Sequence, residues 1–388
     1  MIAPTFAALA CAIWIYLLVA RGGFWRANVR DDAHAYSAIE PLPAVVAVIP
    51  ARDEAESVGV TVRSLLQQAY AGDLRVVVVD DDSADGTAEV ARRAAVEVEA
   101  AQRLTVLSAP PLPPGWTGKL WALNHGVDHA LRSRPGYLLF TDADIGYAPD
   151  TLFQLVGRAH AESRVLVSLM AKLHCASWPE RALIPAFVFF FQMLYPFAWA
   201  NRARSSCAAA AGGCMLVRAE SFVQTGGLAP IAFELIDDCA LARRLKRQGP
   251  IWIGLTNRVH SLRSYASFSE IRGMVARTAY AQLRFSPLWL AMTVAGMALT
   301  YLVPPALAIF GSGVARALGI ATWIAMGIAY LPILRFYRVA WGWAPALPLV
   351  ALLYTGFTLD SARQASRGRA GFWKGRSHAA PARKAGAR

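Results

Sequence analysis

The chain opens with an uncharged apolar run from Ile2 to Ala20, which a soluble fold would have to bury completely. As a helix, this run is long enough to cross the ~30 Å hydrocarbon core of a bilayer. Arg21, Arg26 and Arg30 follow it, and basic residues favour the cytoplasmic end of a span. A cleaved signal peptide carries its positive charges before the apolar run. We therefore expect residues 1–30 to form an N-terminal transmembrane anchor.

A second apolar region covers residues 286–360 and predicts two or three further crossings. Weak breaks divide this region into three segments, at about 287–310, 317–334 and 341–359.

The tail that follows, residues 361–388, holds eight basic residues and no acidic one. If all three segments cross, this tail ends outside the cell, whereas the positive-inside rule places it in the cytoplasm. The sequence leaves both outcomes open. The Pro304–Pro305 pair makes the first segment the candidate for a re-entrant or interfacial one, since prolines cost helical hydrogen bonds.

The net charge of +13 lies largely in this tail and beside the anchor. We expect these basic residues to bind anionic lipid headgroups, which attract charges next to a span. A nucleic-acid surface would combine aromatic residues with repeated basic motifs, and the sequence lacks that pattern, so no nucleic-acid partner is expected. The five cysteines have no metal-ligand spacing and suit a reducing cytoplasm.

The region between the apolar parts, residues 40–285, alternates short apolar runs with helical patterns. The runs 45–49, 74–79, 104–107 and 136–140 have the composition of buried strands. This alternation predicts an α/β fold with a mostly parallel central sheet. Ligands of such sheets bind at the carboxyl ends of the strands.

Acidic side chains follow three of these strands. Glu54 follows the first, Asp80 and Asp82 the second, and Asp142 and Asp144 the fourth. Carboxylates gathered at one edge repel one another unless a cation lies among them. Mg²⁺ or Mn²⁺, which prefer carboxylate and phosphate oxygens, would supply it. A single Asp-x-Asp often only caps a strand, but three acidic strand ends favour a metal-assisted site.

Five motifs stand in order along the chain: IPARDEAESV, VVVVDDDSADGT, Lys119–Asn124, TDADI and Glu234–Leu245. Together they resemble the membrane-associated family-2 glycosyltransferases with the GT-A fold. GKLWALNHG, the run LDSARQASRGRAGFWKGR and the anchor layout are similar, more narrowly, to the hopene-associated glycosyltransferases of bacterial hopanoid gene clusters. The resemblance implies an inverting, metal-dependent transfer of a sugar from a UDP-sugar to a membrane lipid, such as a hopanoid or other isoprenoid lipid. It also implies a multi-pass protein of the bacterial inner membrane with a cytoplasmic catalytic domain.

The same resemblance implies a nucleotide site at the first two strand ends. Glu54, Asp80 and Asp82 would bind the uracil and ribose of the donor. The backbone near Pro50 and Ala51 would shape the pocket for the base.

Further residues carry implied roles at the diphosphate and the sugar. Lys119 and Arg277 would contact the diphosphate. Asp142 and Asp144 would bind the donor, with Asp144 the more direct metal ligand. Asp238 would be the general base, because a carboxylate within ~3 Å must take the proton of the acceptor hydroxyl.

Two positions depart from the family pattern. Asp237 stands where the family has a glutamate, one methylene longer, which leaves its role in doubt. The family's Gln-x-x-Arg-Trp motif keeps only its arginine, Arg277.

Simpler explanations compete with these roles. Asp238 could be a helix cap, Lys119 a solvated surface lysine, and Arg277 a contact to lipid phosphate. The alternative functions are a processive polysaccharide synthase-like enzyme and a non-catalytic membrane scaffold that retains a nucleotide-binding sheet. A synthase should have more crossings and the complete arginine motif, and a scaffold should have lost the acids.

Two stretches predict contact with the acceptor. The small residues of 208–217 would let a backbone approach the sugar or acceptor closely. The aromatic stretch 184–199 predicts either a segment dipping into the headgroups or a buried core helix.

Overall fold

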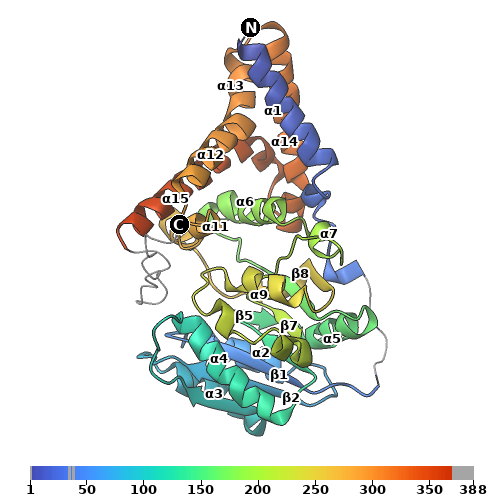
Figure 1. The fold of residues 1–388 in the computed structure, drawn as a ribbon, viewed down its shortest axis with the longest axis vertical. Coiled ribbons are helices and arrows are strands. Elements are labelled where there is room, and N and C mark those ends of the chain that lie inside the picture. Colours follow the sequence, from blue (N-terminus) through green and yellow to red (C-terminus); the bar gives the residue numbers. More distant parts are fainter. Residues whose placement is uncertain (1, 34–35, 37–39, 369–388) are drawn as a thin grey trace, which may run out of the picture. The chain divides into compact units, whose positions relative to one another are not determined.

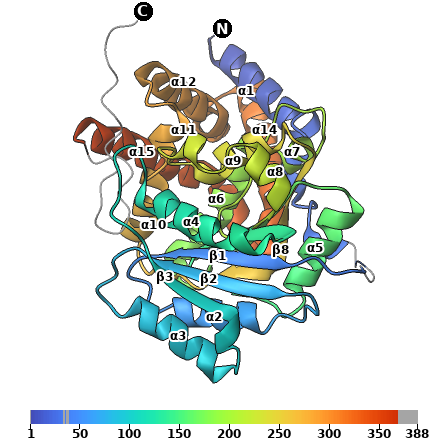
Figure 2. The same cartoon turned by 60° about the horizontal axis from the view of Figure 1, so that its bottom comes forward.

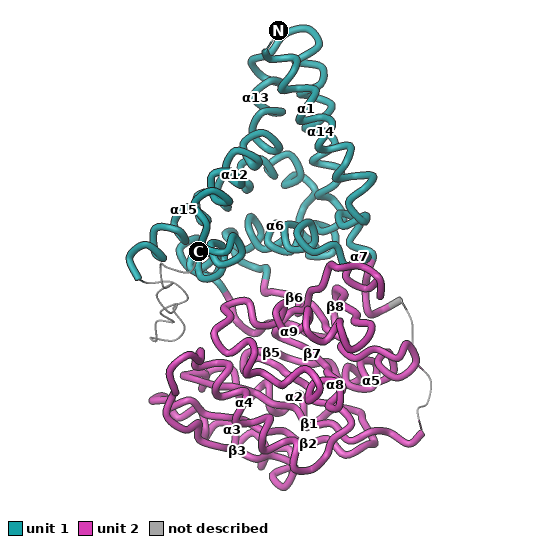
Figure 3. The backbone as a smooth tube through the Cα atoms, viewed as in Figure 1, with its two compact units in different colours: residues 1–28, 175–198, 265–371 teal, residues 29–174, 199–264, 372–388 magenta. Residues whose placement is uncertain are grey.

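The computed structural model describes residues 2–33, 36 and 40–368. These residues form two compact units, which Figure 3 draws in different colours. The helical unit comprises residues 2–28, 175–198 and 265–368, and the α/β unit comprises the described residues of 29–174 and 199–264. The chain therefore leaves the α/β unit for the helical unit twice, once at residue 175 and again at residue 265.

A mixed sheet forms the centre of the α/β unit. Over the described residues it has eight strands in the order β3-β2-β1-β4-β7-β6-β8-β5. β3, β2, β1 and β4 run parallel, with Val45 of β1 opposite Leu74 and Tyr137 on its two sides. β7 pairs antiparallel with β4, and β6 pairs antiparallel with β7. The strands are β1 Val45–Ala51, β2 Leu74–Asp80, β3 Leu104–Ser108, β4 Tyr137–Phe140, β5 Ile145–Tyr147, β6 Leu166–Lys172, β7 Met215–Arg218 and β8 Ile251–Ser261.

Helices cover both faces of this sheet (Figure 2). The first face carries α2 (Val58–Leu66), α3 (Thr87–Glu97) and α5 (Thr151–Ala161). The second carries α4 (Gly118–Ala130), α8 (Ala219–Gln224) and α9 (Asp237–Leu245). Alternate residues of β1 belong to the two cores, because successive side chains of a strand point to opposite faces. The predicted α/β fold with a largely parallel central sheet is confirmed.

Helix α4 lies close against the sheet. It begins where the Thr117 side chain accepts a hydrogen bond from the backbone N–H of Leu120. A Cβ added at Gly126 would lie 2.5 Å from Cγ1 of Val48 and 2.7 Å from Cγ2 of Val79. Only glycine allows this approach, and it fixes the first turn of the helix, which contains Lys119.

The expected elements are found with small shifts at their ends. The first strand continues to Ala51, and the helix that follows it, α2, ends at Leu66. It ends there because the backbone N–H of Ala69 donates to the carbonyl of Pro149, 2.8 Å away, instead of continuing the helix.

The helical unit contains the apolar segments from both ends of the chain (Figure 1). A π-helical turn over 298–302 joins α12 to α13, so that the stretch 287–310 is helical throughout. Pro304 and Pro305 lie in the first turn of α13, directly after this π-helical turn. The helices of this unit are α1 Ile2–Val19, α6 Trp178–Leu194, α10 Phe268–Ala276, α11 Ala279–Gln282, α12 Pro287–Met297, α13 Val303–Phe310, α14 Gly313–Phe336 and α15 Leu347–Ser366.

Five helical stretches among the described residues are long and apolar enough to cross a membrane. They are Ile2–Val19, Trp178–Ala200, Pro287–Phe310, Gly313–Phe336 and Trp341–Ser366. Four of them match the anchor and the three C-terminal segments predicted from the sequence. The other contains the aromatic stretch 184–199. Of the basic tail, residues 361–368 continue the end of α15, and 369–388 lie outside the described residues.

Candidate active site

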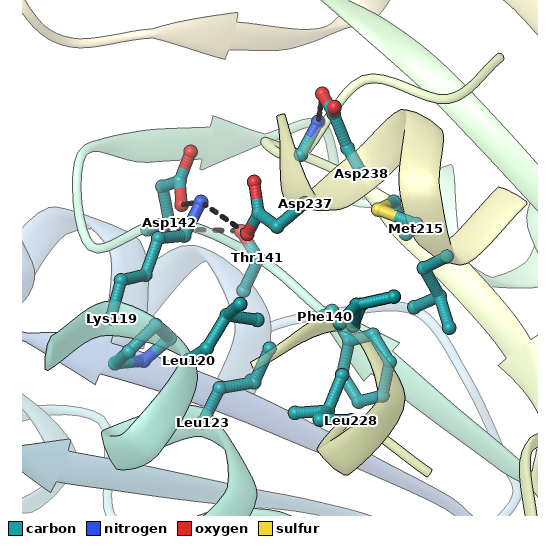
Figure 4. A pocket seen from close by; sticks show the side chains of 14 residues that line it. Lys119, Leu120, Leu123, Phe140, Thr141, Asp142, Met215, Leu228, Asp237 and Asp238 are labelled. Carbon is teal, nitrogen blue, oxygen red and sulfur yellow. Dashed lines mark hydrogen bonds and ion pairs between the residues drawn. The ribbon is translucent and has the colours of Figure 1, made fainter. Parts of the chain in front are cut away.

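A pocket lies beyond the carboxyl ends of β1 and β4 (Figure 4). It brings together Pro50 of β1, Lys119 of α4, Asp142 after β4 and Asp238 of α9. In Figure 4 the charged side chains lie on one side of this pocket, and apolar side chains such as Phe140 lie on the other. Its lining is Pro50, Lys119, Leu120, Leu123, Phe140, Thr141, Asp142, Gly212, Met215, Leu228, Ile231, Asp237, Asp238 and Leu241.

Lys119 is the cation of this pocket and lies between two carboxylates. Its Nζ is 2.9 Å from Oδ1 of Asp142 and 3.5 Å from Oδ2 of Asp237. Burial lowers the pKa of Lys119, but Asp142 and Asp237 raise it by more, so the pKa ends above its usual value. Lys119 is therefore charged at neutral pH and is not a freely solvated surface lysine.

Asp144 is the second carboxylate of the Asp-x-Asp pair. Its negative charge is less well balanced by nearby cations than that of Asp142, which pairs with Lys119. Burial raises its pKa to about 6, and the nearby charges of Asp142 and Glu54 add to the rise. Arg263 opposes the rise, and its segment is held beside the pair by a 2.7 Å hydrogen bond from the N–H of Leu262 to the carbonyl of Asp144.

These carboxylates fit a hard divalent cation. Asp144, Asp142 and Glu54 are close enough for their charges to interact, and their oxygens are the ligands that Mg²⁺ and Mn²⁺ prefer. Within the described ranges no group of three acidic, histidine or cysteine side chains is arranged to hold a metal alone. Asp142 and Asp144 would therefore supply part of the coordination, and phosphate oxygens and water the remainder.

Asp238 is held in place from two directions. Its Oδ2 accepts a 3.0 Å hydrogen bond from the N–H of Gly212, and its Oδ1 accepts one of 2.6 Å from the N–H of Cys239. Burial and the charge of Asp237 raise the pKa of Asp238, and the two N–H groups and Lys119 oppose the rise, so that the pKa is about 6. The residue at the helix cap is Ile236, so Asp238 stands inside the first turn of α9.

The stretch 210–213 next to Asp238 is fixed residue by residue to buried groups. The carbonyl of Gly213 accepts from the hydroxyls of Thr141 and Tyr147, at 2.9 and 3.1 Å. Ser168 Oγ accepts from the N–H of Ala211 at 2.9 Å. This part of the Ala/Gly-rich stretch therefore joins the end of β4 to the start of α9.

The loops after β1 and β2 are held together by hydrogen bonds around the predicted nucleotide-binding acids. Oδ1 of Asp80 accepts hydrogen bonds from the N–H and hydroxyl of Ser83, the first at 3.2 Å. The N–H of Glu54 donates to Oγ1 of Thr87 at 2.8 Å. The Asp82 side chain is 84% exposed and lies 3.9 Å from the guanidinium of Arg52.

Sequence reasoning missed Arg52. Its guanidinium lies 3.7 Å from a carboxylate oxygen of the buried Asp81 and also donates to the carbonyl of Asp81. Arg52 thus compensates Asp81 and also lies within 4.0 Å of carboxylate oxygens of Asp53 and Asp82. The signal was present in the motif, because Arg52 stands directly before Asp53 and Glu54.

The remaining predicted residues lie in two places. Ala51 is fully buried at the end of β1, and its carbonyl accepts from the N–H of Asp81 at 2.8 Å. Arg277 ends α10 in the helical unit, so its predicted contact with the diphosphate stays a prediction.

The pocket and the parallel strands that carry it fall in one continuous region of the chain. Residues 46–226 match glycosyl transferase family 2. The match includes Lys119, Asp142 and Gly212, and it ends before Asp237 and Asp238. It supports an enzyme of the glycosyltransferase class, as the sequence predicts.

Two curated glycosyltransferases align with part of the chain. The 4,4'-diaponeurosporenoate glycosyltransferase of Staphylococcus aureus strain USA300 is 35% identical over 105 residues, which is 27% of this chain and 24% of that protein. The protein of the same name from strain bovine RF122 / ET3-1 is 36% identical over 101 residues, 26% of this chain and 24% of that protein. The chain thus spans about a quarter of the length of these relatives.

A solved structure resembles almost the whole chain. The mannosyltransferase from Pyrobaculum calidifontis in complex with GDP-Man and Mn²⁺ gives a TM-score of 0.54 at 23% identity. The comparison covers 89% of this chain and 98% of that one. This likeness establishes the fold, and the predicted GT-A fold is confirmed.

Proposed function

We propose that this protein transfers a sugar, with inversion, from a nucleoside diphosphate sugar to the hydroxyl group of a membrane lipid. The observation that carries the proposal is the position of Asp238. Its carboxylate is fixed by Gly212 and Cys239 in the same pocket as the Lys119–Asp142 pair. A base and an anion-binding cation in one pocket are what direct displacement of a nucleoside diphosphate requires.

Different residues act on the acceptor and on the leaving diphosphate. Asp238 takes the proton of the acceptor as the new bond to the anomeric carbon forms. Lys119 stabilises the negative charge that develops on the leaving diphosphate, and Asp237 holds the lysine in place. Asp142 and Asp144 would hold a divalent cation, which would add positive charge beside that leaving group.

The donor is proposed to be a UDP-sugar, on the implied roles of Glu54, Asp80 and Asp82. The mannosyltransferase of the same fold is described in complex with GDP-Man, so a GDP-sugar is the alternative donor to test.

The acceptor is proposed to be an apolar lipid such as a hopanoid or other isoprenoid lipid. The apolar helices of the helical unit support a membrane location, and a relative is named for 4,4'-diaponeurosporenoate. We place the protein in the bacterial inner membrane with the α/β unit in the cytoplasm. The basic tail would there meet anionic headgroups, although residues 369–388 lie outside the described part of the chain.

The test is a transfer assay with purified protein in detergent or vesicles. UDP- and GDP-sugars are offered with total bacterial lipid extract and either Mg²⁺ or Mn²⁺, and mass spectrometry identifies lipids that gain a hexose. A glycosylated lipid formed from a UDP-sugar supports the proposal. Polymer formation would favour a polysaccharide synthase, and no transfer with any donor would favour the scaffold.

A further inference from the structure

We propose that three stretches of this chain cross the bilayer, α1, residues 287–310 and α14, and that α6 and α15 do not cross. α6 and α15 instead remain on the side where the chain enters and leaves the α/β unit. The inference rests on chain connectivity and on contacts within the helical unit, and it does not depend on the donor or acceptor.

The path of the chain shows why α6 does not cross the bilayer. The chain leaves the sheet at the end of β6 and returns to it at the start of β7, and these two strands are paired, with Leu166 opposite Val217. Both ends of α6 are therefore attached to the same sheet on the same side of the membrane. A single crossing would put them on opposite sides, so α6 lies along the membrane face despite a composition that suits a span.

The start of α6 is fixed next to the start of α10. A capping box closes its first turn, in which Ser177 accepts from the N–H of Glu180 and the Glu180 carboxylate accepts from the N–H of Ser177. The same carboxylate accepts a 2.7 Å bond from the N–H of Tyr265, where the chain re-enters the helical unit. α10 begins three residues later, at Phe268, so its start lies beside the start of α6.

Contacts near both ends of α15 indicate that this helix does not cross the bilayer. Just before it, the ring of Trp343 lies 5.8 Å from that of Trp178, which in turn lies 5.2 Å from Phe268 at the start of α10. In its last turns, the Ser361 hydroxyl accepts from the N–H of Tyr280 at 3.0 Å and donates to the carbonyl of Ala276.

The middle of α15 contacts α6. The Tyr354 hydroxyl donates to the carbonyl of Leu183 in α6 at 2.9 Å. The segment just before α15 thus meets the start of α6, and α15 itself meets α6 at its centre and α10 and α11 near its end. A helix with this set of neighbours returns to the side from which it began.

The three crossing stretches are packed on one another. Trp14 of α1 donates to the carbonyl of Thr300 at 2.8 Å and packs edge-on against Tyr301. α13 and α14 form a hairpin in which a Cβ at Gly319 would lie 2.7 Å from the backbone N of Ala308. Such a close approach at a small residue is typical of paired helices in membranes. Figure 1 shows α1, α13 and α14 side by side.

The lengths of these stretches fit a bilayer. The stretches 287–310 and 313–336 have 24 residues each, and at 1.5 Å per residue each is about 36 Å long. The 18 residues of α1 cover about 27 Å, just under the ~30 Å of hydrocarbon.

The distribution of charge agrees with three crossings. Basic residues flank the inner ends: Arg21 and Arg26 follow α1, Arg284 precedes α12, and Arg335 and Arg338 end the α14 stretch. At the opposite end, among the described residues, Arg316 is the one basic residue near the turn between α13 and α14. With three crossings the tail after α15 lies on the inner side, as the positive-inside rule requires. The segment that fails to cross is therefore the last one and not the proline-containing first.

The test is cysteine labelling of the full chain in its membrane. The five native cysteines are replaced by alanine in a background shown to keep its fold by thermal melting. Single cysteines are then introduced as Ser312→Cys at the hairpin turn, Ser366→Cys at the end of α15 and Arg181→Cys in α6, with Arg132→Cys in the α/β unit as the inner control. A membrane-impermeant maleimide is added to spheroplasts and to inverted vesicles.

We expect Ser312→Cys to be labelled in spheroplasts and the other three only in inverted vesicles. Labelling of Ser366→Cys from outside would show that α15 crosses, and protection of Ser312→Cys in spheroplasts would show that the hairpin does not. Either result overturns the proposal. Labelling after detergent solubilisation confirms that each cysteine can react.

Discussion

The ammonium of Lys119 lies 2.9 Å from Asp142 and 3.5 Å from Asp237, so that one cation connects the Asp-x-Asp pair to the first turn of α9. The two carboxylates come from distant parts of the sequence, one after β4 and one in α9. Lys119 also lowers the pKa of Asp238 through its charge.

Replacing Lys119 by methionine should impair transfer and change its pH dependence. Loss of one charge that stabilises the leaving group typically costs ~100-fold to 1,000-fold in turnover. Without the lysine the pKa of Asp238 should rise, so the acid limb of the rate profile should move to higher pH. Lys119→Arg, which keeps the charge, should preserve the position of that limb. An unchanged profile in Lys119→Met would contradict an electrostatic role.

Replacing Asp238 by asparagine should stop the chemistry without loosening the donor. Asparagine keeps a side-chain oxygen to accept from Gly212, but it cannot take a proton. We expect turnover to fall by ~100-fold to 10,000-fold with donor affinity near that of the wild type. Titration calorimetry measures the donor affinity, and initial rates measure the turnover. Normal turnover would mean that the base lies elsewhere, with Asp237 as the first alternative.

The turnover of the wild-type protein should fall as the pH drops through about 6. The pKa of Asp238 is raised to about 6, and the base works only in its ionised form, so each pH unit below that value should cost about tenfold. The measurement uses saturating donor and metal, because a bound cation keeps Asp144 ionised. A turnover number that stays level down to pH 5 would exclude Asp238 as the base.

Replacing Asp144 by asparagine should abolish metal binding and stabilise the metal-free protein. Because the folded state raises the pKa of Asp144 from 3.8 to about 6, ionisation of this carboxylate lowers stability progressively between these two pH values, and the full effect is present above pH 6. In excess chelator, Asp144→Asn should therefore melt at a higher temperature than the wild type at pH 8, by a smaller margin at pH 5, and at nearly the same temperature below pH 3.8.

The matched control for this variant is Asp73→Asn, at an exposed carboxylate paired with Arg75. It should leave both melting curves and Mn²⁺ binding close to those of the wild type. Wild-type transfer itself should be lost in excess chelator and return with Mg²⁺ or Mn²⁺. Full activity in the chelator would remove the metal from the proposal.

Replacing Gly126 by alanine should destabilise the α/β unit. The new methyl would meet Val48 and Val79 at 2.5 and 2.7 Å, and overpacking of this kind typically costs about 1–3 kcal/mol. Gly273→Ala is the control, since a Cβ at that exposed helical glycine meets nothing within 4 Å. That change should raise stability by up to ~1 kcal/mol through helix propensity. Thermal melts in detergent compare the two.

Local pattern was sufficient to predict the main elements of this protein. The apolar runs defined the four parallel strands β1 to β4, because a strand buried on both faces has to be apolar at every position. The positions of the acids placed Asp142 and Asp144 at the carboxyl edge of the sheet, since parallel strands deliver their carboxyl ends to one edge, and the family resemblance added Lys119 and Asp238. The long uncharged stretches likewise identified the helices that could enter a membrane.

Only the tertiary structure decided which charges compensate one another and which apolar helices return to the same side. Arg52 satisfies Asp81, and Asp144 is left with Arg263, a residue that no motif connects to it. α6 has the composition of a span, yet its two ends are joined to paired strands. Composition reports whether a side chain tolerates an apolar environment. Pair distances and the path of the chain depend on contacts between residues far apart in sequence, and these exist only once the chain has folded.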